Sequence, residues 1–234
     1  MRALPGTSPF AADDGSADPA LAAELARHQE GESELSAVVT ALAGTRVLVA
    51  ILPHGREITP QDEAAGAKAQ AAVIGVGTGD GRGAMPVFTS VAALAAWRAD
   101  ARPVPTPAAQ AAQGALEAGW EVLVLDPGGP VSVRLPRPAV VALAQGSPWR
   151  PAVSAGAVAD EVAAEIRAAL AGVPELAGVA VEPGERAEVV VVLVVRPGLD
   201  RAALDGVVAR VNEALTANAT VAERVDSLEL RLRS

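Results

Sequence analysis

The apolar run Val189–Val195 places the tightest limit on what this chain can fold into. Six of its seven residues are valines, and β-branched side chains favour strands. The run is far too short to cross a bilayer, which takes about 20 apolar residues in a helix. Because both faces of such a strand are apolar, the sequence predicts that Glu188–Arg196 is the central strand of a sheet inside a folded domain.

The segments around this strand predict an α+β domain. Apolar residues recur at helical spacing before and after it, and two shorter apolar runs predict further strands. The resulting order, α-β-β-α-β, is that of an open-faced sandwich with a three-stranded mixed sheet. The predicted elements are the helix 157–171, the strands 179–182 and 188–196, the helix 200–217 and the strand 228–232.

The last predicted strand, Leu228–Leu232, should lie parallel to the central strand, because a strand–helix–strand crossover joins parallel neighbours. It would lie at or near an edge of the sheet. Only Glu229 and Arg231 carry charge there to discourage pairing with another chain. We therefore expect any self-association, such as a homodimer, to run through this C-terminal domain.

The first part of the chain predicts another small α+β domain. Residues 1–18 have no apolar period and carry several acids, which predicts a disordered tail. Pro19 suits the first turn of a helix that runs to His28. Ser33 is expected to cap the next helix, which ends at Gly44. Further predicted elements are the strands 45–52, 71–76, 84–88, 121–125 and 131–135, and the helices 91–97, 107–118 and 138–146, with Thr89 or Ser90 as the cap of the first of these helices and an extended stretch at Pro103, Pro105 and Pro107.

The stretch Ser147-Pro148-Trp149-Arg150-Pro151 separates the two patterns. Proline-flanked segments of this kind are typical of domain boundaries. The sequence thus predicts a disordered tail over residues 1–18, an N-terminal domain over residues 19–150 and a C-terminal domain over residues 151–234.

Composition narrows the function classes. The formal net charge is −9, which opposes binding to nucleic acid or to an anionic membrane. The absence of cysteine excludes disulfides, thiolate nucleophiles and zinc–thiolate sites. Residues 1–19 contain acids instead of the apolar core of a signal peptide, so a cytoplasmic location is the expectation.

Glycines at positions 75, 77 and 79 follow a predicted strand in a spacing that superficially resembles a nucleotide-binding loop. A dinucleotide site requires a helix directly after the glycines, because the helix N-terminus holds the pyrophosphate. Here Asp80-Gly81 predicts a tight turn into another strand, so a plain hairpin is favoured.

The sequence offers few other residues that could form a catalytic or metal-binding site. His28 and His54 are the only histidines, and neither belongs to a spacing typical of metal ligands. The nucleophile motif Gly-x-Ser-x-Gly is absent. Glu161 and Glu165 lie one helical turn apart and are expected to form a solvated face. We therefore expect no catalytic residues, no metal site and no cofactor.

The residues best suited to an interaction surface are Trp97, Arg98, Arg102 and Trp149. Tryptophan and arginine are the usual anchors of binding patches. Trp97 ends an apolar helix and also suits a core position, while Trp149 could join the domains from within the linker.

The run Lys68–Pro151, about a third of the chain, resembles the N-terminal domain of the SseB family in the form found in actinobacteria. Many relatives carry Asn-Pro where this chain has Asp126-Pro127. The residues that carry the resemblance are Asp80-Gly81-Arg82, Met85–Ser90, Ala95-Ala96-Trp97, Ala101–Pro105, Leu123–Pro127, Ala142–Gly146 and Trp149.

The resemblance implies a family named for enhanced serine sensitivity, which is a phenotype, and it supplies no catalytic residues. The leading hypothesis is a non-enzymatic binding or regulatory module with a protein partner. One alternative is a protein that binds a small polar metabolite linked to serine, or an enzyme that acts on one. The other is a structural protein that self-associates through its C-terminal domain.

Overall fold

A computed structural model describes residues 10, 13–51, 76–77 and 82–233 of the chain. It divides into two compact units, Met1–Trp149 and Arg150–Ser234. Both units contain helices and sheets, so the α+β class is confirmed. His54, the turn Asp80-Gly81 and most of the predicted strand 71–76 lie outside the described residues.

The N-terminal unit is built on a mixed sheet with the strand order β4-β1-β3-β5-β6, and the short β2 also pairs with β3. The neighbours β3 and β5 are parallel, while the other pairs are antiparallel. The pairing of β2 with β3 is the expected hairpin. The strands are β1 (Arg46–Ile51), β2 (Val76–Gly77), β3 (Gly83–Phe88), β4 (Arg102–Pro107), β5 (Val122–Leu125) and β6 (Val133–Leu135).

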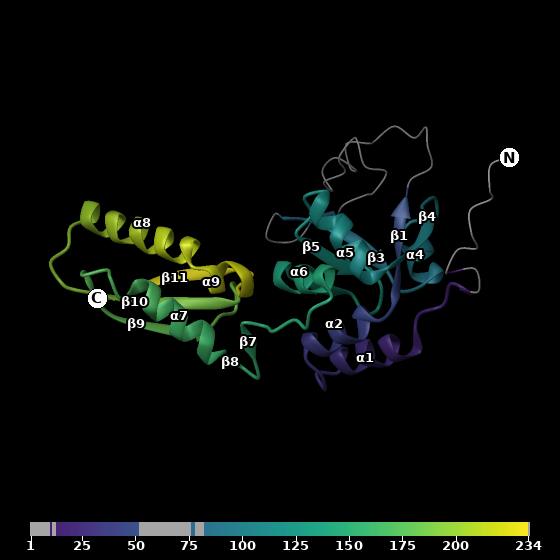
Figure 1. The fold of residues 1–234 in the computed structure, drawn as a ribbon, viewed down its shortest axis with the longest axis horizontal. Coiled ribbons are helices and arrows are strands. Elements are labelled where there is room, and N and C mark those ends of the chain that lie inside the picture. The colour runs from purple at the N-terminus through teal and green to yellow at the C-terminus, as the bar shows by residue number, and fades with distance from the viewer. Residues whose placement is uncertain (1–9, 11–12, 52–75, 78–81, 234) are drawn as a thin grey trace. The chain divides into compact units, whose positions relative to one another are not determined.

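Helices cover both faces of this sheet (Figure 1). Side chains alternate along a strand, so Val47 of β1 joins one apolar cluster and Leu48 joins another. The larger cluster lies against α1 (Pro19–Gln29), α2 (Leu35–Ala43), α5 (Ala108–Glu117) and α6 (Arg137–Gln145). The smaller cluster lies under α4 (Val91–Trp97) and centres on Phe88 and Leu94.

The helix ends agree with the sequence in most places. Pro19 lies in the first turn of α1, and Ser90 caps α4 by accepting a hydrogen bond from the Ala93 amide. The predicted Ser33 cap is wrong. The second helix begins at Leu35 with the extended Glu34 before it, so Ser33 is too far from the first turn to cap it.

The edge strand β4 holds its prolines at alternate positions. The amide of Ala108 donates to the Thr45 carbonyl, so the backbone groups of Val104 and Thr106 also face β1. The prolines at positions 103, 105 and 107 therefore face outward, where the missing N–H costs the sheet no hydrogen bond. The predicted extended stretch is a proline-lined edge strand.

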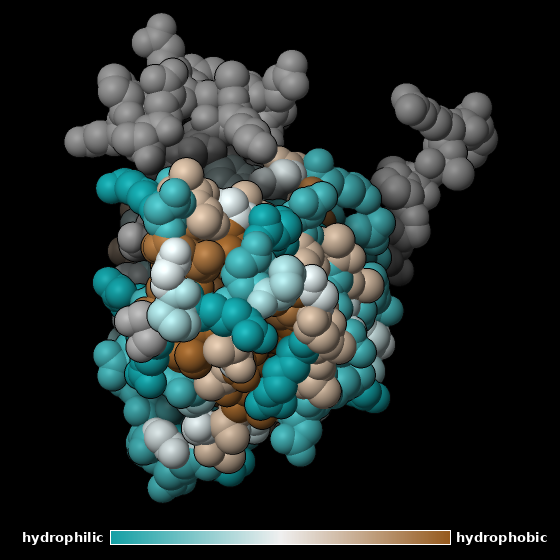
Figure 2. Space-filling model, turned by 90° about the vertical axis from the view of Figure 1, so that its left-hand side faces the viewer, coloured by the Kyte–Doolittle hydropathy of each residue, from teal (hydrophilic) through white to brown (hydrophobic). Residues whose placement is uncertain are grey.

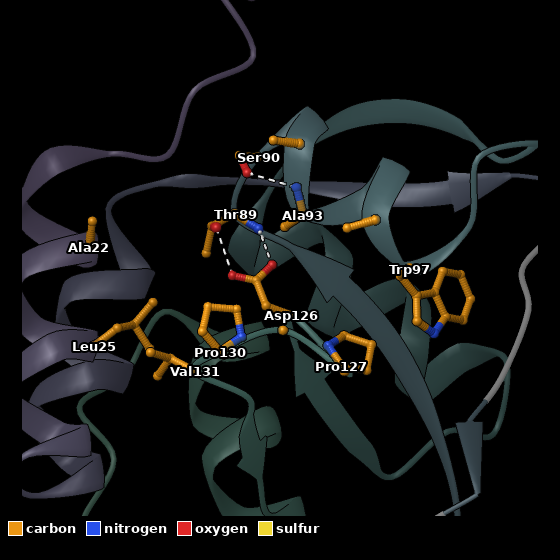
Figure 3. A pocket seen from close by; sticks show the side chains of 14 residues that line it. Ala22, Leu25, Thr89, Ser90, Ala93, Trp97, Asp126, Pro127, Pro130 and Val131 are labelled. Atoms are coloured by element: carbon orange, nitrogen blue, oxygen red, sulfur yellow. Dashed lines mark hydrogen bonds between the residues drawn. The ribbon is translucent and has the colours of Figure 1, made fainter.

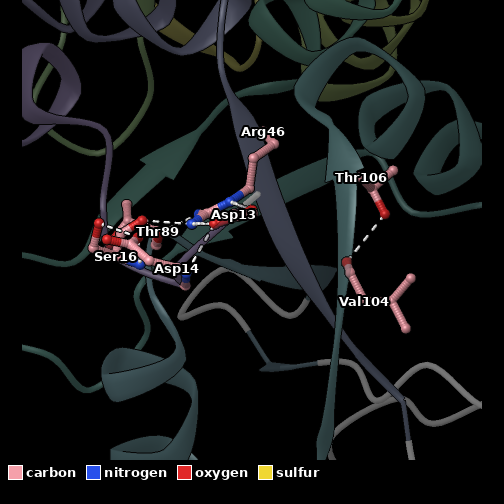
Figure 4. A network of polar contacts seen from close by, with 8 residues as sticks. Asp13, Asp14, Ser16, Arg46, Thr89, Val104 and Thr106 are labelled. Atoms are coloured by element: carbon pink, nitrogen blue, oxygen red, sulfur yellow. Dashed lines mark hydrogen bonds and ion pairs between the residues drawn. The ribbon is translucent and has the colours of Figure 1, made fainter. Parts of the chain in front are cut away.

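Residues 10 and 13–18 are the described part of the predicted disordered tail, and the segment 13–18 differs from that prediction. The Arg46 guanidinium donates to the Asp13 carboxylate, to the Ser16 carbonyl and to the Thr89 carbonyl (Figure 4). This ion pair lowers the pKa of Asp13 from 3.8 to about 2, and Asp18 caps α1. One arginine on β1 thus ties the segment to the sheet, a contact that local sequence does not indicate.

The C-terminal unit contains the predicted three-stranded mixed sheet, in the order β11-β10-β9. The central position of β10 is confirmed, as is its parallel pairing with β11. The helices α7 and α8 contribute Ile166 and Val211 to the same apolar cluster as Val191 of β10. The elements are α7 (Asp160–Leu170), β9 (Leu176–Pro183), β10 (Val189–Val195), α8 (Arg201–Ala217) and β11 (Leu228–Arg233).

This unit also has elements that the sequence analysis missed. The strands β7 (Val153–Ser154) and β8 (Ala157–Val158) form a small hairpin, so the first helix begins at Asp160 and not at residue 157. A further helix, α9 (Ala219–Arg224), precedes β11. Arg224 at its end donates to the carbonyls of residues 150 and 151, which fixes the start of the unit.

The second face of β10 carries no helix from the main cluster. Val190 and Val192 point away from the side that holds Val191, and both lie outside that cluster. Their neighbours include Glu182 on β9 and Glu229 on β11. This face lacks a helix of the main cluster, as expected for the open side of the predicted sandwich, but Val190 and Val192 are themselves buried, at 0% and 2% exposed. None of the described helices is long and apolar enough to span a membrane.

Candidate functional site

A pocket of about 420 Å³ lies where the parallel strands β3 and β5 end. The chain leaves β3 into Thr89 and α4, and it leaves β5 into the turn that starts at Asp126. Ligand sites in sheets often lie outside the carboxyl ends of parallel strands, because the following loops diverge there. Figure 3 shows the pocket, which is lined by Ala22, Leu25, Thr89, Ser90, Ala92, Ala93, Ala96, Trp97, Asp126, Pro127, Gly128, Gly129, Pro130 and Val131.

Asp126 joins the two sides of this pocket. Its carboxylate accepts one hydrogen bond from the Thr89 amide at 2.8 Å and another from the Thr89 hydroxyl at 2.7 Å (Figure 3). Its own amide donates to the Val87 carbonyl, which continues the contact between β3 and β5. The carboxylate therefore holds the two loops at a fixed separation.

The backbone of Asp126 explains why this residue type stands here. Its φ of 47° lies in the left-handed region, which aspartate and asparagine tolerate better than other non-glycine residues. Either side chain could also accept from the Thr89 amide. Asparagine is therefore the residue that could replace Asp126 at the least cost.

Burial raises the pKa of Asp126, although its bonds to Thr89 work in the opposite direction. The side chain is only 9% exposed. A buried carboxyl of this kind can be a general acid or base, but both of its oxygens are occupied by Thr89. The site favours a structural role for this group.

Trp97 lies at the side of the pocket formed by α4 (Figure 3). Its ring stacks at a tilt on Phe88, with ring centroids 5.1 Å apart. Phe88 is fully buried, whereas Trp97 is half-buried. Trp97 is thus both a part of the smaller apolar cluster and a wall of the pocket.

The structure does not gather the four predicted surface residues into one patch. Arg98 pairs with Asp100 at 2.9 Å, and Arg102 is exposed on β4. Trp149 packs against the larger apolar cluster, while Trp97 packs against the smaller one on the other face of the sheet. Of the four, Trp97 alone lines this pocket.

The other polar candidates have local structural partners. His28 shares a hydrogen bond of 2.9 Å between its Nδ1 and the Ser33 carbonyl. Glu161 and Glu165 reach Arg224 and Asn218, so they link α7 to α9 and are more than a solvated face. Over residues 10, 13–51, 76–77 and 82–233, no group of three or more His, Asp or Glu side chains could hold a metal ion.

The sequence analysis missed the pocket and the role of Asp126. Asp126-Pro127 is a strong turn signal. The turn alone accounts for an aspartate at this position, so the sequence does not indicate that Asp126 also binds Thr89. One indication was present, since three motifs that carry the family resemblance contain Thr89, Trp97 and Asp126. The first two of these motifs are close in sequence, the third begins only at Leu123, and all three meet at the pocket.

Comparison with known proteins gives one match. The family model of the SseB protein N-terminal domain matches residues 20–142, which is more than half of the chain and includes every element around the pocket. No curated protein and no solved structure matches the chain. The match and the converging motifs agree, and the chain belongs to the SseB family.

Proposed function

We propose that the N-terminal unit is a non-enzymatic binding module whose pocket takes an apolar side chain of a protein partner. The observation that carries this proposal is the lining of the pocket. It consists of alanine, glycine, proline, leucine, valine and tryptophan, with three further polar side chains. A volume of about 420 Å³ lies within the usual range of ligand sites.

The polar side chains of the lining are already engaged. The Thr89 hydroxyl donates to Asp126, and the Ser90 hydroxyl accepts from the Ala93 amide. Asp126 uses one oxygen for each of its two bonds to Thr89. A ligand would therefore gain most from apolar contact and little from polar side chains.

The small residues give an apolar side chain close access to the walls. Ala93 and Ala96 on α4 leave room beside the Trp97 ring. Burial of an aliphatic side chain against such a surface is worth about 1.5–3 kcal/mol, and an aromatic wall adds directional contact. This suits a single anchoring residue of a larger partner, with the rest of the affinity coming from the surface around it.

The rival function is the binding or conversion of a small polar metabolite, to which the family name points through serine. Such a ligand carries an ammonium and a carboxylate, and its site must supply charged partners for both. The described lining offers one carboxylate, which Thr89 occupies, and no cation. We therefore favour the apolar ligand.

A fluorine NMR titration tests the choice between the two. The chain contains three tryptophans, which 5-fluorotryptophan labels and single Trp→Phe variants assign. We expect N-acetyl-leucinamide at millimolar concentration to shift the Trp97 resonance and to leave those of Trp120 and Trp149 in place. Free L-serine should shift none of them. A shift of Trp97 by serine alone would replace this proposal with the metabolite hypothesis.

A matched pair of variants ties the response to the pocket. Ala96 and Ala95 are both exposed on α4, but only Ala96 lines the pocket. Ala96→Leu should fill the pocket and abolish the shift caused by N-acetyl-leucinamide, while Ala95→Leu should preserve it. Equal responses of the two variants would place the probe elsewhere.

A further inference from the structure

We propose that β11 pairs antiparallel with β11 of a second copy of this chain, about a two-fold axis at Leu230. This inference concerns the C-terminal unit and does not depend on the proposed pocket. In the part of the chain that the structure describes, β11 pairs with β10 on one side only. Its other side is an open sheet edge, which is a template for another strand.

The backbone hydrogen bonds show which residues of β11 face outward. The Val189 amide donates to the Ser227 carbonyl, so Ser227, and in alternation Glu229 and Arg231, direct their backbone groups at β10. The N–H and C=O groups of Leu228, Leu230 and Leu232 therefore point away from the sheet. In an antiparallel pair these three residues must form the hydrogen-bonded positions.

One register satisfies this condition and pairs opposite charges without placing like charges opposite each other. With Leu230 facing Leu230 of the second copy, each Leu228 faces a Leu232, and each Glu229 faces an Arg231. The three leucine positions supply about six backbone hydrogen bonds. The Glu–Arg pairs fall at the positions without backbone hydrogen bonds, where facing side chains come closest.

The neighbouring registers match less well. A shift by one step of the hydrogen-bond pattern in one direction places Arg231 opposite Arg231, although each Glu229 then faces an Arg233, and a shift in the other direction places Glu229 opposite Glu229. Like charges directly opposite each other are unfavourable. The opposite edge strand, β9, carries Glu182 as its single charged residue, so no self-pairing of β9 aligns opposite charges.

The exposure of Leu232 also favours a second copy of this chain as the partner of β11. This side chain is 48% exposed, whereas Leu228 and Leu230 on the same face pack against the apolar cluster. Figure 2 views this end of the C-terminal unit and shows apolar atoms at the surface among polar ones. In the proposed register Leu228 of the second copy lies beside Leu232, and the leucine row continues across both strands.

Charge exchange tests the proposal on the full chain. Within one chain Glu229 already pairs with Arg231 at 2.9 Å and with Arg186 at 3.1 Å, and in the dimer it would also face Arg231 of the second copy. The side chains of Glu229 and Arg231 are 20% and 45% exposed, and circular dichroism would verify that their substitution leaves the fold intact. In sedimentation velocity we expect the wild type to dimerise and Glu229→Arg or Arg231→Glu to weaken the dimer about tenfold. Glu229→Gln and Arg231→Gln, which remove charge without reversing it, should weaken it less.

Two combinations restore the pairs. The double variant Glu229→Arg/Arg231→Glu should dimerise like the wild type, because each arginine again faces a glutamate. A mixture of the two single variants should form a heterodimer for the same reason. A wild type that stays monomeric up to its solubility limit would overturn the proposal, as would single variants that dimerise normally or a double variant that stays weak.

Discussion

The two units each expose an edge strand, and the two edges are built in opposite ways. On β4 the outward positions are prolines, which cannot donate a hydrogen bond to another strand. On β11 the outward positions are leucines with complete backbone groups, and the alternating residues carry charge. The first edge is closed to any strand, whereas the second is selective for a strand of matching charge. The residue types at the outward positions of an edge strand therefore decide whether the sheet ends there or can add another strand.

The two sheets also differ in how helices cover their faces. Helices cover both faces of the N-terminal sheet, and its candidate site is a pocket beyond the strand ends. The C-terminal sheet has its helices in one cluster, and the buried Val190 and Val192 on its second face lie outside that cluster. We infer that the first unit recognises side chains and that the second recognises backbone.

The largest expected effect concerns the inward positions of β4. Val104→Pro should lower the free energy of unfolding by about 3 kcal/mol, because the Val104 N–H faces β1 and proline would remove that ladder bond. Pro105→Ala is the matched control, since its nitrogen faces outward, and its stability should change little. Urea unfolding followed by circular dichroism measures both, and equal effects would contradict the assigned direction of the strand.

Adjacent valines on β10 test the difference between the two sheet faces. Val191→Ala should destabilise the C-terminal unit by about 2 kcal/mol, because it opens a cavity in the cluster that α7 and α8 cover. Val192→Ala removes the same atoms from the opposite face and should cost roughly half as much, since the flexible Arg231 beside it can fill the gap. Thermal unfolding of the two variants gives the comparison. A greater loss from Val192→Ala would mean that the second face is packed more tightly than the first.

Asp126 provides the next test, at the pocket. Asp126→Ala should destabilise the N-terminal unit by about 2 kcal/mol, because two buried hydrogen bonds are lost and alanine disfavours a positive φ. Asp126→Asn should cost far less, since asparagine tolerates that backbone and can bond to Thr89.

The same residue makes a prediction about pH. Because burial raises the pKa of Asp126 in the folded state, its contribution to stability is greatest in acid and falls as pH rises through that pKa. Asp126→Asn removes this dependence, so the variant should compare more favourably with the wild type at neutral pH than in acid. Thermal unfolding at several pH values checks the sign.

The smallest effect is expected for the segment held by Arg46. Since the pKa of Asp13 is lowered to about 2, the ion pair contributes fully above pH 3.8 and is lost as pH falls toward 2. Asp13→Asn should cost less than about 1 kcal/mol at neutral pH and should reduce the acid sensitivity of unfolding. Asp205→Asn, at an exposed position of α8, is the control. Identical acid unfolding of both variants would show that the segment is not held by this pair.

The sequence alone predicted those features of the fold that depend on local residue patterns. The central place of β10, the parallel β11 and the Ser90 cap follow from apolar runs, chain order and short-range hydrogen bonding. The hairpin of β7 and β8 was missed because strands of two residues leave no period to detect. The tie between Arg46 and Asp13 was missed because no local signal joins residues so far apart in sequence.

The pocket escaped prediction for a related reason. Its walls come from α1, α4 and the turn after β5, which meet only because β3 and β5 are parallel neighbours. The sequence predicted each of these elements but not the strand order of that sheet. Asp126 was identified as a turn residue, and its bonds to Thr89 depend on that strand order.

The order of β10 and β11 along the chain has a consequence during synthesis. The valine-rich β10 ends at Val195, and its parallel neighbour begins only at Leu228. At ordinary translation rates roughly 2–7 s pass between these two points. For that time β10 can pair with β9 on one side, but its other edge has no partner, a state prone to pairing with other chains. We expect chaperones to act on this chain in that interval.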